Sequence, residues 1–258
     1  MEPSKMTPAQ AARFAIRTGR HTGPTHGLAL GYVQCNLVIL RRALAFDFLV
    51  YCQRNPRACP VLEVLEPGES EPRLSAPGAD LRFDLPKYAI YRNGIRTQEE
   101  HGIEHLWEPE LVSFLIGSGI TFDQALERAG VPTHRDRWVL RTRRPTVPAG
   151  PFHGNLVVTM RWLTPAQAIV ATQVSSRFPM NHGAPIHMGD PAELGADLQQ
   201  PLFGPPVPAL PPGLIPVFWA CGVTPQAAAE TARIDLMITH SPAHGFITDL
   251  LADQLCIP

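Results

Sequence analysis

The chain has 258 residues, of which 45% are hydrophobic, so it can bury a substantial core as one large domain or two smaller ones. Its 22 basic and 23 acidic residues give a formal net charge of -1, which argues against nucleic-acid binding. No stretch approaches the roughly 20 apolar residues that span a bilayer, so we expect no membrane association.

The first third of the chain is predicted to form two helices and two strands. Thr7, which is followed by a proline, is typical of a helix start, and we expect this helix to end near Gly19. The segment 22–40 ends in a predicted strand. A helix should follow over 41–54, and the apolar run 61–65 indicates a further short strand.

The segment 22–40 also places polar side chains among small and apolar residues. Buried polar groups need hydrogen-bonding partners, which either the protein or a ligand can supply. Both interpretations stay open, a hydrogen-bonded loop that leads into a strand or a substrate-binding segment. The residues concerned are Thr25, His26, Gln34 and Asn36.

We expect residues 81–163 to form a smaller two-layer α+β domain, inserted into a main three-layer α/β/α domain made of residues 1–80 and 164–258. The Asn-Gly pair at 93–94 is typical of a tight hairpin turn. The expected elements of the insert are a hairpin over 87–97, helices over 109–117 and 122–129, and strands over 137–142 and 155–162.

The C-terminal part reads as strand, helix and strand, with the strands over 216–219 and 234–238 and the helix starting at Thr224. This is the βαβ order of a parallel sheet. Ligands bind beyond the carboxyl ends of such strands, so Cys221 and His240 should lie at one rim.

Residues 177–190 gather further reactive side chains among glycines and prolines: Arg177, His182, His187 and Asp190. Arg177 either grips a carboxylate or forms an ion pair, and His187 follows a third predicted strand. For Asp190 a helix cap is favoured over chemistry.

Cys221 precedes Gly222 and a predicted helix start, so free amide groups would favour its thiolate and an anionic substrate group. The alternative is a buried and inert cysteine. His187 and His240 are suited to move protons near neutral pH.

No metal or cofactor is predicted. His182, His187, Asp190, His240 and His244 are acceptable ligands, but their spacing matches no known metal motif. Five cysteines without paired spacing indicate neither a disulfide framework nor a zinc site, and the N-terminus lacks a signal-peptide pattern. We therefore expect a cytoplasmic protein.

Several blocks resemble the hydro-lyase family that includes the D-glutamate cyclases. They span nearly the whole chain and comprise residues 22–36, 46–49, 52–56, 62–68, 176–179, 182–185, 187–191, 217–226 and 238–240. Asn155 and Trp162 differ from the family pattern, which usually has proline there. The resemblance implies a two-part α/β fold and dehydration of D-glutamate to 5-oxo-D-proline.

The leading hypothesis is therefore a lyase that cyclises D-glutamate or a related amino acid. His187 or His240 would act as base and the other as acid, with Cys221 as a less favoured nucleophile. Substrate binding is assigned to Arg177, His26, Gln34, Asn36, His182, Asp190 and Gly222. Two alternatives stay open, a non-catalytic carboxylate-binding protein and a hydratase of another small acid. The expected partner is a small carboxylate, and homo-oligomerisation is left open.

Overall fold

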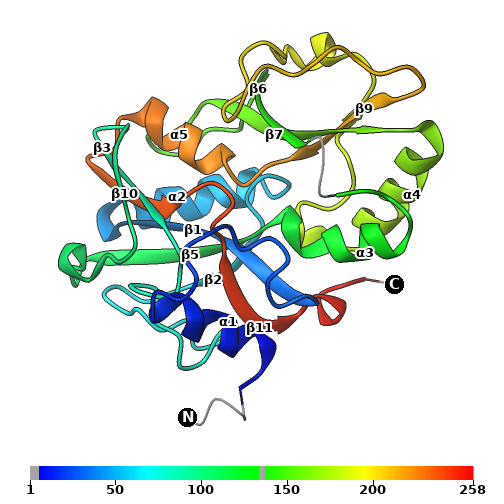
Figure 1. The fold of residues 1–258 in the computed structure, drawn as a ribbon. Coiled ribbons are helices and arrows are strands. Elements are labelled where there is room, and N and C mark those ends of the chain that lie inside the picture. The colour runs from blue at the N-terminus through cyan, green and yellow to red at the C-terminus, as the bar shows by residue number, and fades with distance from the viewer. Residues whose placement is uncertain (1–5, 134–136, 258) are drawn as a thin grey trace.

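The computed structural model describes residues 6–133 and 137–257, which form a mixed α/β fold with two antiparallel sheets (Figure 1). The large sheet has the strand order β2-β5-β1-β10-β3-β4, and β11 also pairs with β1. Its strands are β1 (Tyr32–Arg41), β2 (Val61–Val64), β3 (Tyr88–Arg92), β4 (Ile95–Glu100), β5 (Leu111–Gly117), β10 (Leu236–His240) and β11 (Phe246–Leu251).

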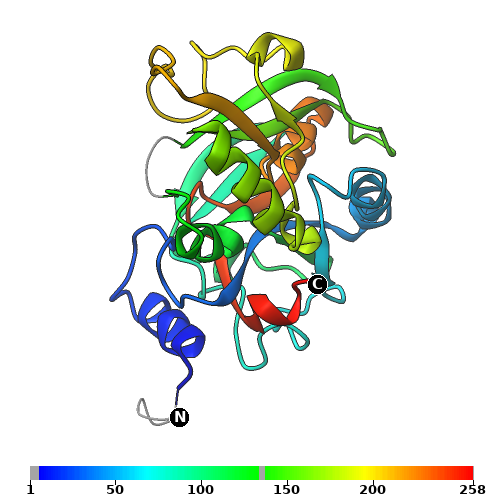
Figure 2. The ribbon, with the colours of Figure 1, turned by 90° about the vertical axis from the view of Figure 1, so that its right-hand side faces the viewer.

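The small sheet has the order β6-β7-β9-β8 and lies above the large sheet in Figure 1. Its strands are β6 (Arg137–Pro145), β7 (Asn155–Leu163), β8 (His187–Met188) and β9 (Ile215–Ala220). The described residues contain the helices α1 (Pro8–Arg17), α2 (Arg42–Arg54), α3 (Asp123–Arg128), α4 (Pro165–Ser176) and α5 (Thr224–Ala232). In Figure 2, α2 and α3 lie on opposite sides of the molecule.

Strand β1 is the centre of the fold because its side chains are buried on both faces. Leu37 and Ile39 belong to one apolar cluster, whereas Val38 and Leu40 belong to another that includes Phe48 of α2. This alternation follows from the two-residue period of a strand. Helix α2 therefore covers one face of the large sheet.

Two of the predicted helix starts are confirmed in detail. Thr7 and Thr164 each accept a hydrogen bond from the amide three residues later, and the glutamine there bonds back to the threonine amide. Thr224 behaves differently, because its hydroxyl donates to the carbonyl of Cys221 at 2.7 Å and Val223 occupies the cap position. This bond ties the start of α5 to the end of β9.

The predicted hairpin is confirmed as β3 and β4. Asn93 and Gly94 adopt φ angles of 51° and 77°, the left-handed values that a two-residue turn of this type requires. An added Cβ at Gly94 would lie 2.5 Å from the carbonyl oxygen of Glu230, so only glycine fits there.

The helix predicted over 109–117 is wrong, because this segment is β5. All seven residues of β5 are buried between β1 and β2. Leu111 and Leu115 face one apolar cluster, and Phe114 faces the other. A short run that is apolar on both faces has no polar alternation to distinguish a strand from a helix.

The parallel βαβ arrangement predicted for the C-terminal part is also wrong. Every strand pairing in the described part of the chain is antiparallel, and β9 and β10 belong to different sheets. Helix α5 therefore connects the two sheets. Residues 81–163 contribute strands to both sheets, so the strands do not divide at the boundaries expected for an inserted domain, and the domain division stays a prediction.

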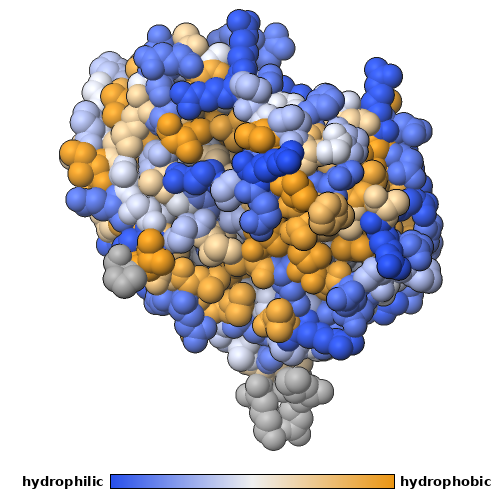
Figure 3. All heavy atoms as spheres, turned by 180° about the vertical axis from the view of Figure 1, so that it is seen from behind, coloured by the Kyte–Doolittle hydropathy of each residue, from blue (hydrophilic) through white to orange (hydrophobic). Residues whose placement is uncertain are grey.

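The surface has both polar and apolar areas. On the face opposite to the view of Figure 1, a broad apolar area is interrupted by hydrophilic residues (Figure 3). Apolar areas of this kind are candidates for contact with another chain, and homo-oligomerisation stays a prediction. Among the helices of residues 6–133 and 137–257, none has the length and apolar character to cross a bilayer.

Candidate active site

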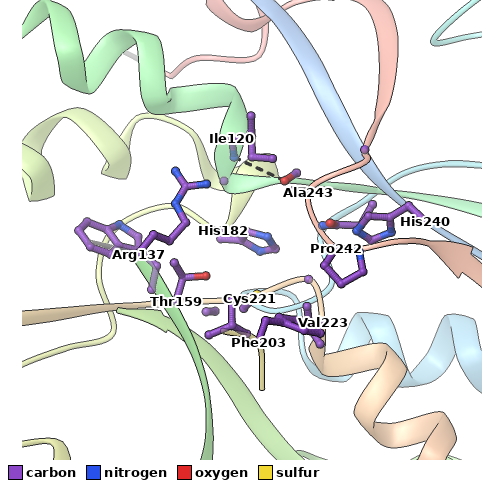
Figure 4. Close-up of a pocket in the computed structure, with 18 of the residues that line it drawn as sticks. Ile120, Arg137, Thr159, His182, Phe203, Cys221, Val223, His240, Pro242 and Ala243 are labelled. Atoms are coloured by element: carbon purple, nitrogen blue, oxygen red, sulfur yellow. Dashed lines mark hydrogen bonds between the residues drawn. The ribbon is translucent and has the colours of Figure 1, made fainter. Parts of the chain in front are cut away.

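A cavity of about 250 Å³ lies between the two sheets and collects side chains from distant parts of the sequence (Figure 4). Asn36 comes from β1, His240 is the last residue of β10, and Cys221 follows β9 directly. The predicted meeting of Cys221 and His240 thus occurs, although through two antiparallel sheets. His182 and Gly222 also line the cavity.

The remaining wall is largely apolar and includes Phe122, Val139 and Trp219. In such surroundings electrostatic interactions are stronger than in water, and an isolated charge is unfavourable. Each polar group in this wall therefore needs a partner, either in the protein or on a ligand.

His182 is held as a neutral imidazole whose Nε2 atom is an acceptor. Its Nδ1 lies 3.0 Å from the carbonyl oxygen of Arg57, and since a carbonyl can only accept, Nδ1 carries the proton. The pKa of His182 is lowered to about 4, mainly by burial; the hydrogen bond to the Arg57 carbonyl opposes this effect and the charge of Arg57 adds to it. Near neutral pH, Nε2 thus offers a lone pair to the cavity.

His240 has the opposite tautomer. The backbone N–H of Leu37 donates to its Nδ1 at 3.2 Å, so in the neutral ring the proton is on Nε2. Burial lowers the pKa of His240 to about 4, with a smaller contribution from His244. His240 is therefore a neutral hydrogen-bond donor at the cavity.

Asn36 and Gly222 are in close contact at the cavity wall. The Asn36 amide donates from Nδ2 to the carbonyl of Gly117 at 3.1 Å. An added Cβ at Gly222 would lie 1.9 Å from this Nδ2 atom. Asn36 can therefore hold this position only if residue 222 is glycine. Both residues were assigned to substrate binding from the sequence.

Cys221 lies at the cavity as a protonated thiol. Burial raises its pKa, and the hydrogen bonds with the Thr159 side chain and the Val223 backbone only partly offset this effect. The free amides expected to favour a thiolate are partly used, since the Thr224 amide donates to the Cys221 carbonyl at 3.0 Å. The local structure does not activate this thiol as a nucleophile.

Two arginines that sequence reasoning missed also line the cavity, Arg137 of β6 and Arg161 of β7. Both guanidinium groups bind the carboxylate of Asp123, with 2.5 Å between Nη2 of Arg161 and Oδ1. Burial lowers the pKa of Arg161 to about 10, so it stays charged at neutral pH. The sequence signal for Arg161 is that it is the one charged residue of the largely apolar strand β7.

Gln34 and His26 lie outside the cavity. Gln34 exchanges hydrogen bonds with Thr25, at 2.8 Å from the Thr25 hydroxyl to Oε1 and 3.0 Å from Nε2 to the Thr25 carbonyl. This agrees with the hydrogen-bonded loop left open as one interpretation. The exposed His26 lies with its Nδ1 3.5 Å from Asp123, beside a separate hollow of about 180 Å³ that Gln34 also lines.

Arg177, His187 and Asp190 also lie outside the cavity. The exposed Arg177 donates from Nε to the carbonyl of Ile257 at 3.2 Å. His187 contacts the carbonyl of Asp190, with 3.0 Å from Nε2 to the oxygen. Asp190 accepts from the amide of Ala192 at 2.9 Å, which is the capping role favoured for it.

Within residues 6–133 and 137–257, no group of three or more His, Cys, Asp or Glu side chains is arranged to hold a metal ion. Independence from metals and cofactors stays a prediction.

Comparisons with known proteins identify the family. The sequence model of the D-glutamate cyclase family matches residues 112–249. A protein of Stutzerimonas stutzeri named "Putative hydro-lyase" is 52% identical over 97% of this chain and 96% of its own. "Putative hydro-lyase YcsI" of Bacillus subtilis is 49% identical over 95% of this chain and 97% of its own.

A nitrogen repressor-like protein from Methanococcus jannaschii of known crystal structure covers 90% of this chain and 92% of its own, with 10% identity and a TM-score of 0.39. That likeness is too low to support an inference. The family match and the near full-length identity to the relatives are both strong, and the chain belongs to the D-glutamate cyclase family.

Proposed function

We propose that this protein is a carbon-oxygen lyase that cyclises D-glutamate, or a closely related amino acid, to 5-oxo-D-proline with loss of water. Membership in the D-glutamate cyclase family and the hydro-lyase names of its relatives support the reaction class. The observation that carries the mechanism is the pair of buried histidines with opposite tautomers at one cavity.

The reaction joins the substrate α-nitrogen to the carbon of its γ-carboxyl group, so one proton must leave the nitrogen and one must reach the departing oxygen. In the proposal, the substrate reacts as an amine and a neutral γ-carboxyl group. The apolar wall favours these uncharged forms, as it favours neutral imidazoles. The same cavity holds the two ends together, which lowers the entropic cost of ring closure.

His182 carries the proton between the two atoms. Its Nε2 accepts a proton from the attacking nitrogen as the nitrogen–carbon bond forms. The resulting imidazolium then donates that proton to the γ-hydroxyl group, which leaves as water while the carbonyl re-forms. One residue thus acts first as base and then as acid, and the protons balance.

His240 stays neutral and stabilises the oxyanion of the tetrahedral intermediate through Nε2–H. A neutral imidazole is a poor proton donor but an effective hydrogen-bond donor. Asn36 adds a second polar group at the same wall. The sequence hypothesis divides the roles of base and acid between His187 and His240. The proposal gives both roles to His182 and makes His240 a hydrogen-bond donor.

The test is to incubate the protein with D-glutamate and, separately, with L-glutamate, and to follow 5-oxoproline by chiral chromatography. We expect 5-oxo-D-proline from D-glutamate and much less product from the L-isomer. Absence of product from both would overturn the proposal.

A further inference from the structure

Arg137 and Arg161 are directly opposite each other on the neighbouring strands β6 and β7. Like charges in this position repel, so the pair requires an acidic partner. Asp123 of α3 supplies it by binding one guanidinium with each of its carboxylate oxygens. Two positive groups thus share the carboxylate of Asp123, and the charge of Glu127 adds a weaker attraction for Arg161.

Each arginine also has one nitrogen atom that donates no hydrogen bond within the described part of the chain. Nε of Arg137 and Nη1 of Arg161 are buried and have no hydrogen-bond partner in the described part of the chain. Only 4% of the Arg161 side chain is exposed, so this donor is removed from bulk water. Buried donors are nearly always paired in proteins, and a missing partner is therefore informative.

The surroundings hold the guanidinium groups in place. The central carbon of the Arg161 guanidinium lies 5.6 Å from the ring centroid of Trp219, which also lines the cavity. Figure 4 shows the Arg137 side chain reaching the cavity on one side of His182, with His240 on the other side. The two arginines and the histidine pair thus line one cavity.

We propose that Arg137 and Arg161 form a subsite for a single ligand carboxylate, and that in the reaction proposed above it holds the α-carboxylate of the amino-acid substrate. The assignment to the α end rests on that proposed function. Guanidinium groups stabilise an ionised carboxylate, which would hinder the loss of oxygen from the γ-carboxyl group. The α-carboxylate keeps its charge throughout the reaction, so binding it does not oppose the chemistry. Asp123 is the positioning residue of this subsite.

Two amides of D-glutamate distinguish the ends of the substrate. D-Glutamine has a free α-carboxylate and a neutral γ end, whereas D-isoglutamine has a neutral α end and a free γ-carboxylate. In titration calorimetry with the full chain, we expect D-glutamine to bind at least about tenfold more tightly than D-isoglutamine, since a charge-assisted hydrogen bond is lost with the second ligand.

The matching variants are Arg161→Met and Arg137→Met, each of which should weaken D-glutamine binding by at least about tenfold. Arg161→Met replaces a buried charge by an apolar side chain and leaves Asp123 paired with Arg137, so we expect it to fold. Arg137 is partly exposed, and its variant provides a second, independent measurement. The control is Arg141→Met, on the same strand but paired with Glu230 on the surface.

The outcomes separate the subsite from the reaction. D-Glutamine binding unchanged in both variants, or tighter binding of D-isoglutamine, would overturn the subsite. Arginine-dependent binding of D-glutamine without turnover of D-glutamate would support the subsite and overturn the proposed function. Turnover of D-glutamate with an unchanged KM in both variants would support the proposed function and overturn the subsite.

Discussion

His182 and His240 use the same ring atom in opposite senses, because Nδ1 of His182 donates to a main-chain carbonyl and Nδ1 of His240 accepts from a main-chain amide. Both partners belong to the backbone, so the fold itself sets the tautomers. The Nε2 atoms of the pair are therefore an acceptor and a donor. This arrangement fits a reaction in which one atom loses a proton while another atom develops negative charge.

The first prediction concerns the base. His182→Asn should lower kcat by about 10²- to 10⁴-fold, the usual contribution of a general base. Asparagine suits this position because His182 has a φ angle of 77°, and asparagine tolerates the left-handed region better than most residues. A melting temperature close to that of the wild type would show that the loss is chemical.

His187→Asn is the matched variant, because it removes a histidine that lies outside the cavity. We expect kcat to change by less than about twofold, as for a surface substitution away from the site. The assignment made from the sequence alone predicts the reverse order of effects. Equal kcat values for His182→Asn and the wild type would contradict the base role proposed here.

The second prediction is a loss of stability in acid. The pKa values of His182 and His240 are lowered by burial to about 4, from an ordinary value of 6.5. The unfolded protein therefore binds more protons between pH 6.5 and 4, so the free energy of unfolding falls as the pH falls through this window. Above pH 6.5, these two histidines do not lower the free energy of unfolding.

The loss should reach about 3 kcal/mol for each histidine at the acid end of the window. Urea unfolding at a series of pH values measures it. The double variant His182→Asn with His240→Gln should flatten the curve between pH 6.5 and 4. An equally steep curve in the double variant would show that other groups cause the acid sensitivity.

Local signals in the sequence predicted several elements correctly. Thr7 and Thr164 carry their capping partners within three residues, and the Asn93–Gly94 turn is determined by its own two residues. The strand β5 and the antiparallel partners of β9 and β10 depend instead on contacts between residues that are far apart in the sequence. Local patterns contain no information on such partners, which is why these predictions were wrong.

The site was predictable to a similar extent. Asn36, His182, Cys221, Gly222 and His240 were all singled out from the sequence and line one cavity. The arginine pair was missed because Arg137 and Arg161 become a site only through cross-strand pairing and a shared carboxylate. Arg177 was preferred for its glycine-rich neighbourhood, but it lines a separate hollow that contains none of the predicted catalytic residues.

The third prediction tests the contact between Gly222 and Asn36. Gly222→Ala would place a Cβ 1.9 Å from Nδ2 of Asn36, so the amide must move. We expect a destabilisation of about 1–3 kcal/mol, as for other overpacked sites, together with a strong loss of activity. Thermal unfolding and initial rates measure the two effects.

Gly23→Ala is the control for that substitution, because its added Cβ would meet only His21 at 3.8 Å, an ordinary contact. It should leave both the melting temperature and kcat nearly unchanged. Wild-type activity in Gly222→Ala would show that Asn36 is not needed in its present position.

The fourth prediction concerns Cys221. Burial raises the pKa of this thiol, so only a small fraction is ionised at neutral pH. Iodoacetamide should therefore modify Cys221 more slowly than a free thiol in solution, as followed by mass spectrometry of the intact protein and its peptides.

If the thiol is only part of the cavity wall, Cys221→Ala should retain kcat within about tenfold, because no covalent step is lost. Cys221→Ser provides a closer match in shape and should behave similarly. A loss of activity of several orders of magnitude in both variants, with unchanged melting temperatures, would instead indicate a thioester intermediate and would require a different assignment for the histidine pair.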